Sequence, residues 1–438
     1  MAKKQANGNK DGRRVAIVSG LRTPFARPAS AYRTLSALDL GKIVVSELLA
    51  RTSVPPREID LCVYGQAIPS LAEPNIAREI VLATTIPKDV DAFSVIRSCA
   101  TSFQSLTSAA EAMLAGQASL AVVGGADSVS DIPLVLSMAV GRTLLEVTKV
   151  SSWAERFRLV TRLSSRDVFP LARALTEPST GLTQGESAET MAKEAAIGRD
   201  DQDRFAHQSH TRATKAYVDH LYESQIMHVV LPPNFDAVLG EDNMVRRDSQ
   251  LDAYAQFAPV FDPKYGTVTD GNTAPLADGA AALLLMTSDK AEALGFTPLG
   301  YLKDWAYGAV DPSGWALLGP THATAKALER AGLGLEHMDV VEMHEAFAAQ
   351  VLCNTKMMAS AAFCEDKLGR STPLGELDPA KLNALGGSLA MGHPFGATGA
   401  RLVLTALQQL RRQGGQFALA TTSAAGGLGA AVILEAAS

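Results

Sequence analysis

Residues 393–421 read HPFGATGARLVLTALQQLRRQGGQFALAT, and their pattern indicates the fold class. Glycine, proline and alanine crowd the start of the stretch, which predicts a tight loop. Apolar residues then recur at helical spacing over residues 397–411, and a short apolar run at residues 417–421 predicts a strand after two glycines. A loop, a helix and a buried strand in this order are typical of an α/β protein.

The first half of the chain repeats this order. Cys99 opens a small-residue helix, expected over residues 102–115, which leads to a buried strand at residues 119–123 and then to a glycine turn. Residues 58–65 (EIDLCVYG) and 337–344 (HMDVVEMH) share a second pattern. We therefore expect an α/β fold of two similar βαβ halves packed in layers, which would bring Cys99 and His393 together at a pseudo-twofold centre.

The same patterns suggest the domain boundaries. Residues 1–12 are polar and basic and are predicted to be a disordered tail, followed by halves at 13–290 and 291–438. In the first half we expect strands at 15–19 and 61–64 and a helix at 38–51. Residues 129–256 differ in character and include a predicted helix at 202–217, so we interpret them as an inserted loop region over the active site.

Within this insert, residues 141–173 are locally basic. Trp153, Phe157 and Val160 would share one face of a helix. Two interpretations remain open: a solvated helix pair packed on the core, or a surface that contacts a membrane or a partner protein. The charged residues are Arg142, Lys149, Arg156, Arg158, Arg162, Arg166 and Arg173, against Glu146, Glu155 and Asp167.

Charge and cysteine content exclude several classes of protein. A net charge of −6 argues against general nucleic-acid binding, which needs a basic surface. The chain has four cysteines, which are Cys62, Cys99, Cys353 and Cys364. They form no CxxC pair and are too few for a disulfide framework, which favours a reducing, cytoplasmic compartment. The start lacks the apolar stretch of a secretory signal, and no apolar run approaches the length that spans a bilayer.

Two residues in these repeated units could carry chemistry. A cysteine at a helix N-terminus, such as Cys99, feels the positive end of the helix dipole, which would lower its pKa; the alternative is a small buried apolar residue. His393 lies among so many glycines and alanines that close backbone approach is expected, and its imidazole could take a thiol proton as a general base. A structural histidine in a tight loop is the alternative.

Two further segments are candidates. His344 and Glu345 follow an apolar strand, which is a usual place for site residues in α/β folds; helix capping by this pair is the alternative. Ser423 starts the turn SAAGGLG, which could present backbone N–H groups as an anion site or could be an ordinary glycine-rich hairpin. No phosphate-loop, metal-ligand or dinucleotide motif appears elsewhere.

Taken together, these motifs resemble the thiolase family over nearly the whole chain. The motif RTPF at residues 22–25 resembles the family's opening signature, and GHPFGATGAR at residues 392–401 is specific. Five further segments lie between them in the expected order: PNIAR (74–78), GGADS (124–128), GESAE (185–189), GTVTDGNTAPLADGAAALLLM (266–286) and the block 319–350. The resemblance implies a thiolase-like fold and thiolytic cleavage of 3-ketoacyl-CoA to acyl-CoA and acetyl-CoA, as in fatty-acid β-oxidation.

The segment MHEAF at residues 343–347 narrows the resemblance. Most thiolases have asparagine where this chain has His344, and histidine together with the basic insert is similar to the β subunits of fatty-acid-oxidation trifunctional complexes. The resemblance therefore implies a homodimer and an α subunit with hydratase and dehydrogenase activities as partners. It implies no cofactor and no metal, since acyl-CoA and CoA are substrates.

The resemblance also implies roles for single residues. Cys99 would be the acylated nucleophile and His393 its base, while His344 and His393 would line one oxyanion hole. The backbone N–H groups of Cys99 and Ala425 would hold the acyl-enzyme oxygen. Phe347 and Gly426 are further expected substrate contacts.

Two positions depart from the family's pattern. Ser423 stands where the family has a second cysteine that shuttles the α-proton of acetyl-CoA, and a hydroxyl is a far weaker acid than a thiol. Ala274 stands where many thiolases have serine or threonine near the CoA pantetheine. Two alternatives follow: a decarboxylating ketoacyl synthase with one cysteine and two histidines, which lacks support because its His-Gly-Thr-Gly-Thr motif is absent, or a catalytically impaired scaffold subunit.

Overall fold

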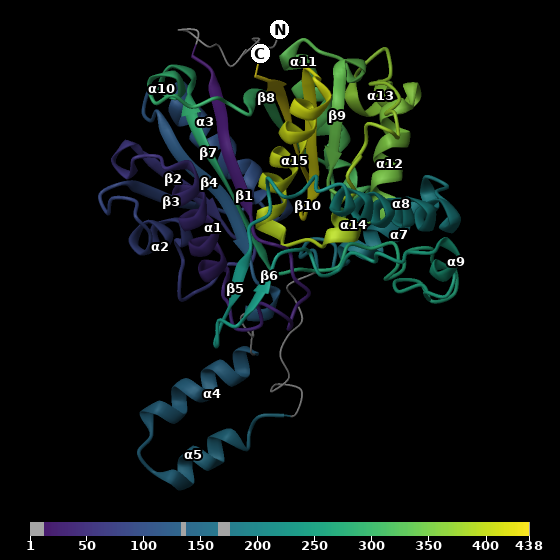
Figure 1. The fold of residues 1–438 in the computed structure, drawn as a ribbon. Helices are drawn as coiled ribbons and strands as arrows, with labels where there is room; N and C mark the ends of the chain where they lie inside the picture. Colours follow the sequence, from purple (N-terminus) through teal and green to yellow (C-terminus); the bar gives the residue numbers. More distant parts are fainter. Residues whose placement is uncertain (1–12, 133–136, 165–175, 438) are drawn as a thin grey trace.

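A nine-stranded mixed sheet runs through both halves of the molecule (Figure 1). The computed structural model describes residues 13–132, 137–164 and 176–437. Across the sheet the order is β3-β2-β4-β7-β1-β8-β11-β10-β9, and β5 and β6 form a separate hairpin. The strands are β1 (Val15–Arg22), β2 (Leu61–Gly65), β3 (Asp91–Val95), β4 (Leu120–Asp127), β5 (Val229–Leu231), β6 (Ala237–Leu239), β7 (Gly279–Thr287), β8 (Gly300–Ala309), β9 (Met338–Met343), β10 (Phe417–Ala424) and β11 (Leu428–Ala436).

The sheet consists of two similar halves, as predicted. In the first, β2 is parallel to β4, and β4 and β1 both pair antiparallel with β7. In the second, β9 is parallel to β10, and β10 and β8 both pair antiparallel with β11. The halves join where β1 meets β8 through three residue pairs, from Val15↔Leu302 to Ile17↔Gly300.

Helices form the remaining layers. α1 (Ala37–Thr52) and α11 (Gly319–Ala331) each cover the outer face of one half-sheet, while α3 (Thr101–Leu114) and α15 (Thr398–Gln413) lie between the half-sheets and contact each other. This central contact is close: a Cβ on Gly399 of α15 would lie 2.9 Å from the backbone nitrogen of Phe103 in α3. A glycine is therefore needed where the two halves meet.

The predicted helices differ from the observed bounds by three residues or fewer, but all four predicted strands end later than predicted; β1, for example, ends at Arg22 rather than at residue 19. Gly124 and Gly125, expected to begin a turn, continue β4 opposite Ala282 and Ala281. A Cβ on Gly124 would lie 2.1 Å from the carbonyl oxygen of Ala281, so these glycines allow close strand packing rather than a turn. Likewise β10 extends to Ala424, beyond the predicted end at residue 421.

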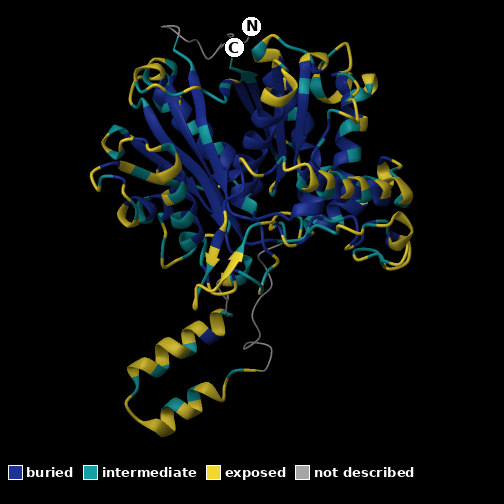
Figure 2. Ribbon diagram, in the orientation of Figure 1, coloured by how far each residue is buried: buried dark blue, intermediate teal, exposed yellow. Residues whose placement is uncertain are grey.

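The insert has two parts with different surroundings. α7 (Gln184–Glu194) and α8 (Arg199–Val218) pack on the second half, against α12 (Ala348–Ala359) and α14 (Ser388–Met391). α4 (Met138–Lys149) and α5 (Trp153–Val160) instead project from the body as a hairpin (Figures 1 and 2). The remaining α-helices in the described part of the chain are α2 (Ile76–Ala83), α9 (Leu251–Tyr254), α10 (Ser288–Ala293) and α13 (Ala361–Leu368).

The hairpin corrects one interpretation of residues 141–173. It does not pack on the core, because the side chains of Trp153 and Phe157 are 81% and 73% exposed. Arg166, Asp167 and Arg173, and the predicted tail at residues 1–12, lie outside the described residues. No helix in the described part of the chain is both long and apolar enough to cross a membrane.

Candidate active site

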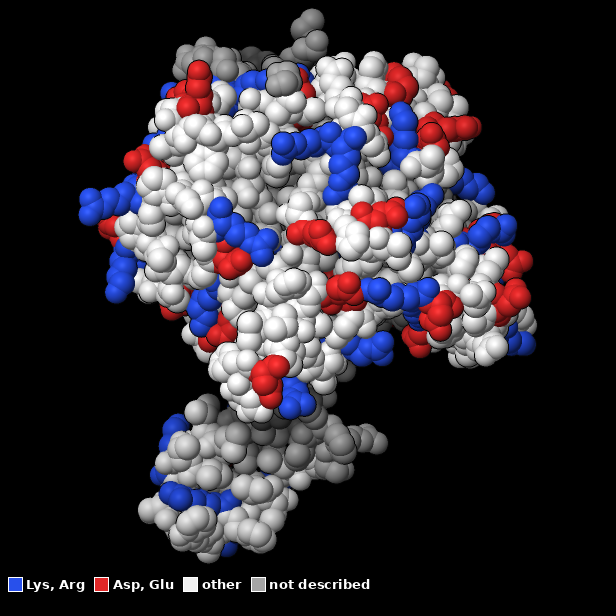
Figure 3. All heavy atoms as spheres, viewed as in Figure 1, with Lys and Arg blue, Asp and Glu red and all other residues white. Residues whose placement is uncertain are grey.

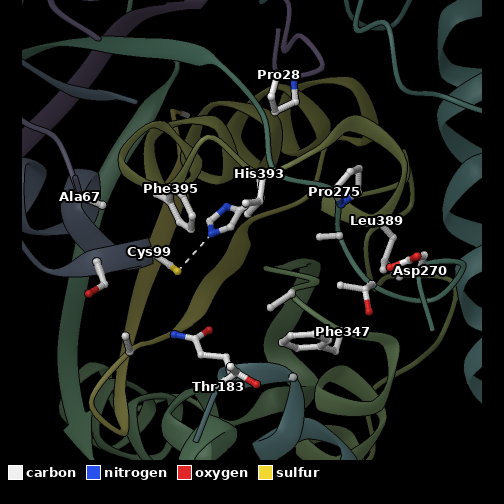
Figure 4. Close-up of a pocket in the computed structure, with 18 of the residues that line it drawn as sticks. Pro28, Ala67, Cys99, Thr183, Asp270, Pro275, Phe347, Leu389, His393 and Phe395 are labelled. Atoms are coloured by element: carbon white, nitrogen blue, oxygen red, sulfur yellow. Dashed lines mark hydrogen bonds between the residues drawn. The ribbon is translucent and has the colours of Figure 1, made fainter. Parts of the chain in front are cut away.

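Cys99 and His393 meet where the two central helices begin. Cys99 lies in a short 3-10 turn, Ser98–Ala100, directly before α3, and His393 lies just before the equivalent turn, Phe395–Ala397, ahead of α15. The Cys99 Sγ and His393 Nε2 atoms are 3.1 Å apart, within hydrogen-bond distance (Figure 4). The repeated loop–helix–strand unit thus brings together two residues 294 positions apart, as the pattern predicted.

The backbone before Cys99 is strained. Ser98 has φ 48°, a left-handed value that is unfavourable for a residue with a side chain. Thr101 supports this turn, because its hydroxyl accepts from the Arg97 N–H at 2.9 Å and donates to the Ser98 carbonyl at 2.7 Å. Strain of this kind persists only where the surrounding structure holds it, and it is common at active sites.

Burial controls the protonation of the pair. Burial, with a further contribution from the charge of Asp127, raises the pKa of the Cys99 thiol to about 12. Burial, followed by the charge of Arg401, lowers the pKa of His393 to about 3. The resting pair is therefore a neutral thiol and a neutral imidazole. The predicted lowering of the thiol pKa by a helix dipole is wrong, because desolvation outweighs it.

His344 completes a cluster at the end of β9. Its ring centroid lies 4.0 Å from that of His393, and its Nδ1 atom lies 2.9 Å from the hydroxyl of Ser388. Burial, then the charges of His393 and Arg401, keep the pKa of His344 well below the ordinary value, so the ring is neutral. The capping alternative is wrong, because α12 begins at Ala348 and its N-cap, Phe347, has no side-chain cap.

Asp127 ties the two halves together beside the cluster. Its buried carboxylate accepts from the backbone N–H groups of Ala67 and Ile68 in the first half and Gly396 in the second. Burial raises its pKa to about 6 despite these bonds. Asp127 was not among the residues predicted from the sequence, although the GGADS motif at residues 124–128 contains it.

A cavity of about 920 Å³ lies beside Cys99 and His393. Three predicted substrate contacts, Ala274, Phe347 and Ala425, line it; Phe347 is visible in Figure 4. Parts of the predicted insert also line it: Glu177 and Thr183 in the loop before α7, and Met244 and Arg246 in the segment after β6, but no described residue of the hairpin.

Two predicted residues have other surroundings. The N–H of Gly426 donates to the Glu177 carboxylate at 2.7 Å, so this group is already occupied. Ser423 is buried near the end of β10, which packs against the turn that holds Cys99, and it is not among the residues that line the cavity. The described residues provide no hydrogen bond to its hydroxyl group, in contrast to the well-anchored Asp127.

Comparisons with known proteins agree with this geometry. The chain matches the thiolase N-terminal domain over residues 15–289 and the thiolase C-terminal domain over residues 296–436. It is 51% identical to the 3-ketoacyl-CoA thiolase of Yersinia enterocolitica, with 97% of this chain and 98% of that protein covered. It is 48% identical to the 3-ketoacyl-CoA thiolase of Shewanella amazonensis, with 99% of this chain and 100% of that protein covered.

Solved structures agree as well. The crystal structure of human mitochondrial 3-ketoacyl-CoA thiolase is similar with a TM-score of 0.83 and 27% identity, covering 97% of this chain and 99% of that one. For the Bacillus anthracis acetyl-CoA acetyltransferase the TM-score is 0.84 and the identity 30%, with the same coverage. The domain matches, the full-length relatives and the cysteine–histidine pair at the centre of the two halves show that this chain belongs to the thiolase family.

Proposed function

We propose that the protein is a 3-ketoacyl-CoA thiolase that forms an acyl-enzyme on Cys99. The observation that carries this proposal is the 3.1 Å contact between Cys99 Sγ and His393 Nε2 beside a cavity of about 920 Å³. The cavity has the size of a small-molecule site. The full-length bacterial relatives named as 3-ketoacyl-CoA thiolases support the choice of substrate.

The reaction starts from the neutral pair. As Sγ attacks the 3-keto carbon of the substrate, the thiol proton passes to Nε2 of His393, because only the thiolate is an effective nucleophile. The bond between carbons 2 and 3 then breaks, its electron pair leaves as the enolate of acetyl-CoA, and the enolate takes up one proton, which balances the proton lost by Cys99 and leaves His393 neutral again. The CoA thiol finally gives its proton to His393 and attacks the Cys99 thioester; acyl-CoA is released, and this proton passes from His393 to the Cys99 sulfur.

Each negative oxygen needs a hydrogen-bond donor. The buried Nε2 atom of His344 has no partner among the described residues and is suited to donate to the developing oxyanion. The backbone N–H groups of Cys99 and Ala425 would hold the thioester oxygen, since Ala425 lines the same cavity. One such donor is typically worth roughly 3 kcal/mol of barrier.

A direct test combines turnover with adduct mapping. We expect CoA-dependent cleavage of 3-ketoacyl-CoA substrates of several chain lengths, and an acyl adduct on Cys99 by mass spectrometry after incubation with acyl-CoA. An adduct on Cys62, Cys353 or Cys364 alone would contradict the proposed nucleophile. Turnover that depends on malonyl-CoA would instead indicate a decarboxylating synthase, and absence of both labelling and turnover would indicate a scaffold subunit.

We propose that the protein is a homodimer joined at the β3 edge of the sheet. β3 ends the strand order, and Phe93 and Ile96 on and beside it are 38% and 58% exposed. Open strand edges readily pair with another chain. Because β3 leads into the Ser98–Ala100 turn, a dimer contact here would also hold the Cys99 segment. Ile96→Lys should lower the mass measured by light scattering from that of a dimer toward that of a monomer. A monomeric mass for both the wild-type protein and the variant would contradict the proposed dimer.

We also propose that the α4–α5 hairpin contacts an anionic membrane surface. Leu145, Trp153 and Phe157 are 64%, 81% and 73% exposed, and basic side chains are visible on the hairpin in Figure 3. Apolar and basic groups together on a projecting helix pair suit the interface of an anionic bilayer. The described charged residues of the hairpin segment are Arg142, Lys149, Arg156, Arg158 and Arg162, against Glu146 and Glu155.

Vesicle sedimentation tests the hairpin. Wild-type protein should bind vesicles of phosphatidylglycerol and phosphatidylcholine more strongly than pure phosphatidylcholine, and salt should weaken binding. The double variant Trp153→Ser/Phe157→Ser should lose binding and keep thiolysis in solution, while the surface change Val218→Ser, away from the hairpin, should alter neither. If the wild-type protein does not bind vesicles but co-purifies with an α subunit, and the double variant abolishes this co-purification, then the hairpin contacts that partner and not a membrane.

We also propose a partner subunit and a cellular compartment for this protein. An α subunit that produces 3-ketoacyl-CoA would supply the substrate of this site, and we propose such a complex. A cytoplasmic location is supported by the four free, buried cysteines and by the bacterial relatives. Affinity purification from the native cell, with fractionation of cytoplasm and membranes, tests both.

A further inference from the structure

The two histidines of the site have similar neighbours that differ in one contact. Each Nδ1 atom faces a buried hydroxyl: Ser388 at 2.9 Å for His344 and Thr398 at 2.7 Å for His393. Within the described residues, the hydroxyl of Ser388 alone has a second partner, the guanidinium group of Arg401 at 2.9 Å. Because of this one contact, the two rings differ in the hydrogen-bonding states that they can adopt.

Arg401 determines which way the Ser388 hydroxyl points. Its guanidinium group can only donate hydrogen bonds, so the Ser388 oxygen accepts from it. Among the described residues, the other partner of this oxygen is His344 Nδ1. If the hydroxyl hydrogen did not point to Nδ1, it would remain buried without an acceptor, which is unfavourable. The hydroxyl therefore donates to Nδ1.

Arg401 is itself held in place. It donates to the Glu342 carboxylate at 3.2 Å, and Gln409 donates to the other oxygen of that carboxylate at 2.7 Å. Arg401, Glu342 and Gln409 are all buried, so the guanidinium group has little freedom to turn away from Ser388. A continuous path of hydrogen bonds thus runs from Gln409 to His344.

A neutral imidazole with an acceptor at Nδ1 carries its hydrogen on Nε2. We propose that Ser388 and Arg401 are positioning residues that hold His344 as the Nε2–H tautomer, a constant donor toward the substrate oxygen. The inference rests on the proposed thiolase reaction. It accounts for the buried Nε2 atom of His344, which has no partner among the described residues.

The same reasoning separates the roles of the two rings. The described residues offer the Thr398 hydroxyl no second hydrogen-bond partner, so this hydroxyl can donate to His393 or accept from it. His393 can therefore keep its hydrogen on Nδ1 and leave the Nε2 lone pair free for the Cys99 proton, as the base of this site needs. The Cys99 sulfur and one nitrogen of each ring lie within 4.8 Å of one another, a spacing that could suit a metal ion. In the proposed tautomer neither ring nitrogen of His344 has a free lone pair, because Nε2 carries a hydrogen and Nδ1 accepts from Ser388, so a metal ion would have to displace one of these hydrogens.

Nuclear magnetic resonance of the wild-type protein tests the tautomer without any turnover. In protein labelled with ¹⁵N in its histidine rings, with His344→Asn used to assign the signal, we expect the Nε2–H tautomer for His344 from pH 6 to 8. Ser388→Ala should shift the ring signals toward a mixture of tautomers. A wild-type Nδ1–H tautomer, or a protonated ring, would overturn the inference, whatever the enzyme's activity.

Kinetics provide the second measurement. Ser388→Ala should lower kcat of thiolysis by about 10- to 100-fold with little change in KM, less than the 10²–10³-fold typical for loss of an oxyanion donor. Ser388→Thr retains the hydroxyl and should restore most of kcat. The control Ser105→Ala removes another buried hydroxyl, which donates to Gly124 O at 2.8 Å. A fall in kcat no larger than that of the control would overturn the positioning role.

Discussion

The two halves of this thiolase use one local architecture to deliver two different reactive groups. Each central helix follows a short 3-10 turn and leads into a buried strand: Ser98–Ala100, α3 and β4 in the first half, and Phe395–Ala397, α15 and β10 in the second. The first half has a cysteine within its turn, and the second has a histidine just before its turn. A repeated fold can thus supply nucleophile and base from two corresponding segments, because its symmetry brings the corresponding turns together.

The halves differ in how their turns are held. The backbone at Ser98 is strained, with φ 48°, and Thr101 fixes it, whereas the segment before His393 uses Gly392, which adopts φ 95° without cost to a side chain. β4 ends at Asp127, which binds three backbone N–H groups, while Ser423 near the end of β10 has no side-chain hydrogen bond among the described residues. The following changes test these differences.

Cys99→Ala should have the largest effect. Removal of the nucleophile should lower thiolysis by at least about 10⁴-fold, because the covalent route disappears. Cys364→Ala, which alters a buried thiol in α13, should leave turnover close to wild type. Steady-state thiolysis of the three forms is the measurement. Residual turnover above about one per cent for Cys99→Ala would mean that the first half does not supply the nucleophile.

His393→Ala should lower thiolysis and iodoacetamide alkylation of Cys99 at neutral pH by roughly 10²–10⁴-fold. Burial raises the pKa of this thiol to about 12, so without the base few molecules carry the thiolate at pH 7. The alkylation rate of the variant should therefore rise with pH throughout the accessible range and approach that of wild type only at high pH. Coinciding pH curves for the two proteins would show that His393 is not the base.

Gly399→Ala should disturb the contact between the halves. Its new Cβ would lie 2.9 Å from the Phe103 backbone nitrogen and 2.9 Å from Ser102 Oγ, so α3 and α15 must move apart. We expect about 1–3 kcal/mol lower free energy of unfolding, typical of overpacking. Gly141→Ala is the matched control, because nothing lies within 4 Å of its Cβ and alanine favours a helix. Denaturant unfolding that destabilises both variants equally would contradict the helix-contact explanation.

Ser423→Cys should give the smallest change, and in the opposite direction. A thiol is a far stronger acid than a hydroxyl and transfers protons better, so thiolysis should rise by at least roughly tenfold while burst-phase acylation of Cys99 stays the same. Ser128→Cys, a change of a buried serine just beyond β4, controls for the added thiol. Equal thiolysis by wild type and Ser423→Cys would mean that another group already carries the proton.

Local pattern was enough to predict much of this molecule. Helical spacing located α1, α3, α8 and α15 within three residues at each end, because an amphipathic helix must bury one face wherever it lies. The repeated order of elements indicated two similar halves and the pairing of Cys99 with His393. The end of β4 was missed because glycines usually mark turns, and only contact with Ala281 across the sheet shows why they continue a strand here.

The residue types of the site and their order follow from local motifs, because Cys99, His344 and His393 all lie in patterns that are recognisable without a structure. Their protonation depends on the folded molecule, because the pKa of a group responds to burial and to charges from distant segments, and burial reversed the lowering expected for Cys99. The tertiary structure also decided the role of Ser388, since the hydroxyl takes its direction from Arg401, which is 13 residues away along the chain. Hydrogen-bond direction is a property of assembled neighbours, and a linear pattern does not contain it.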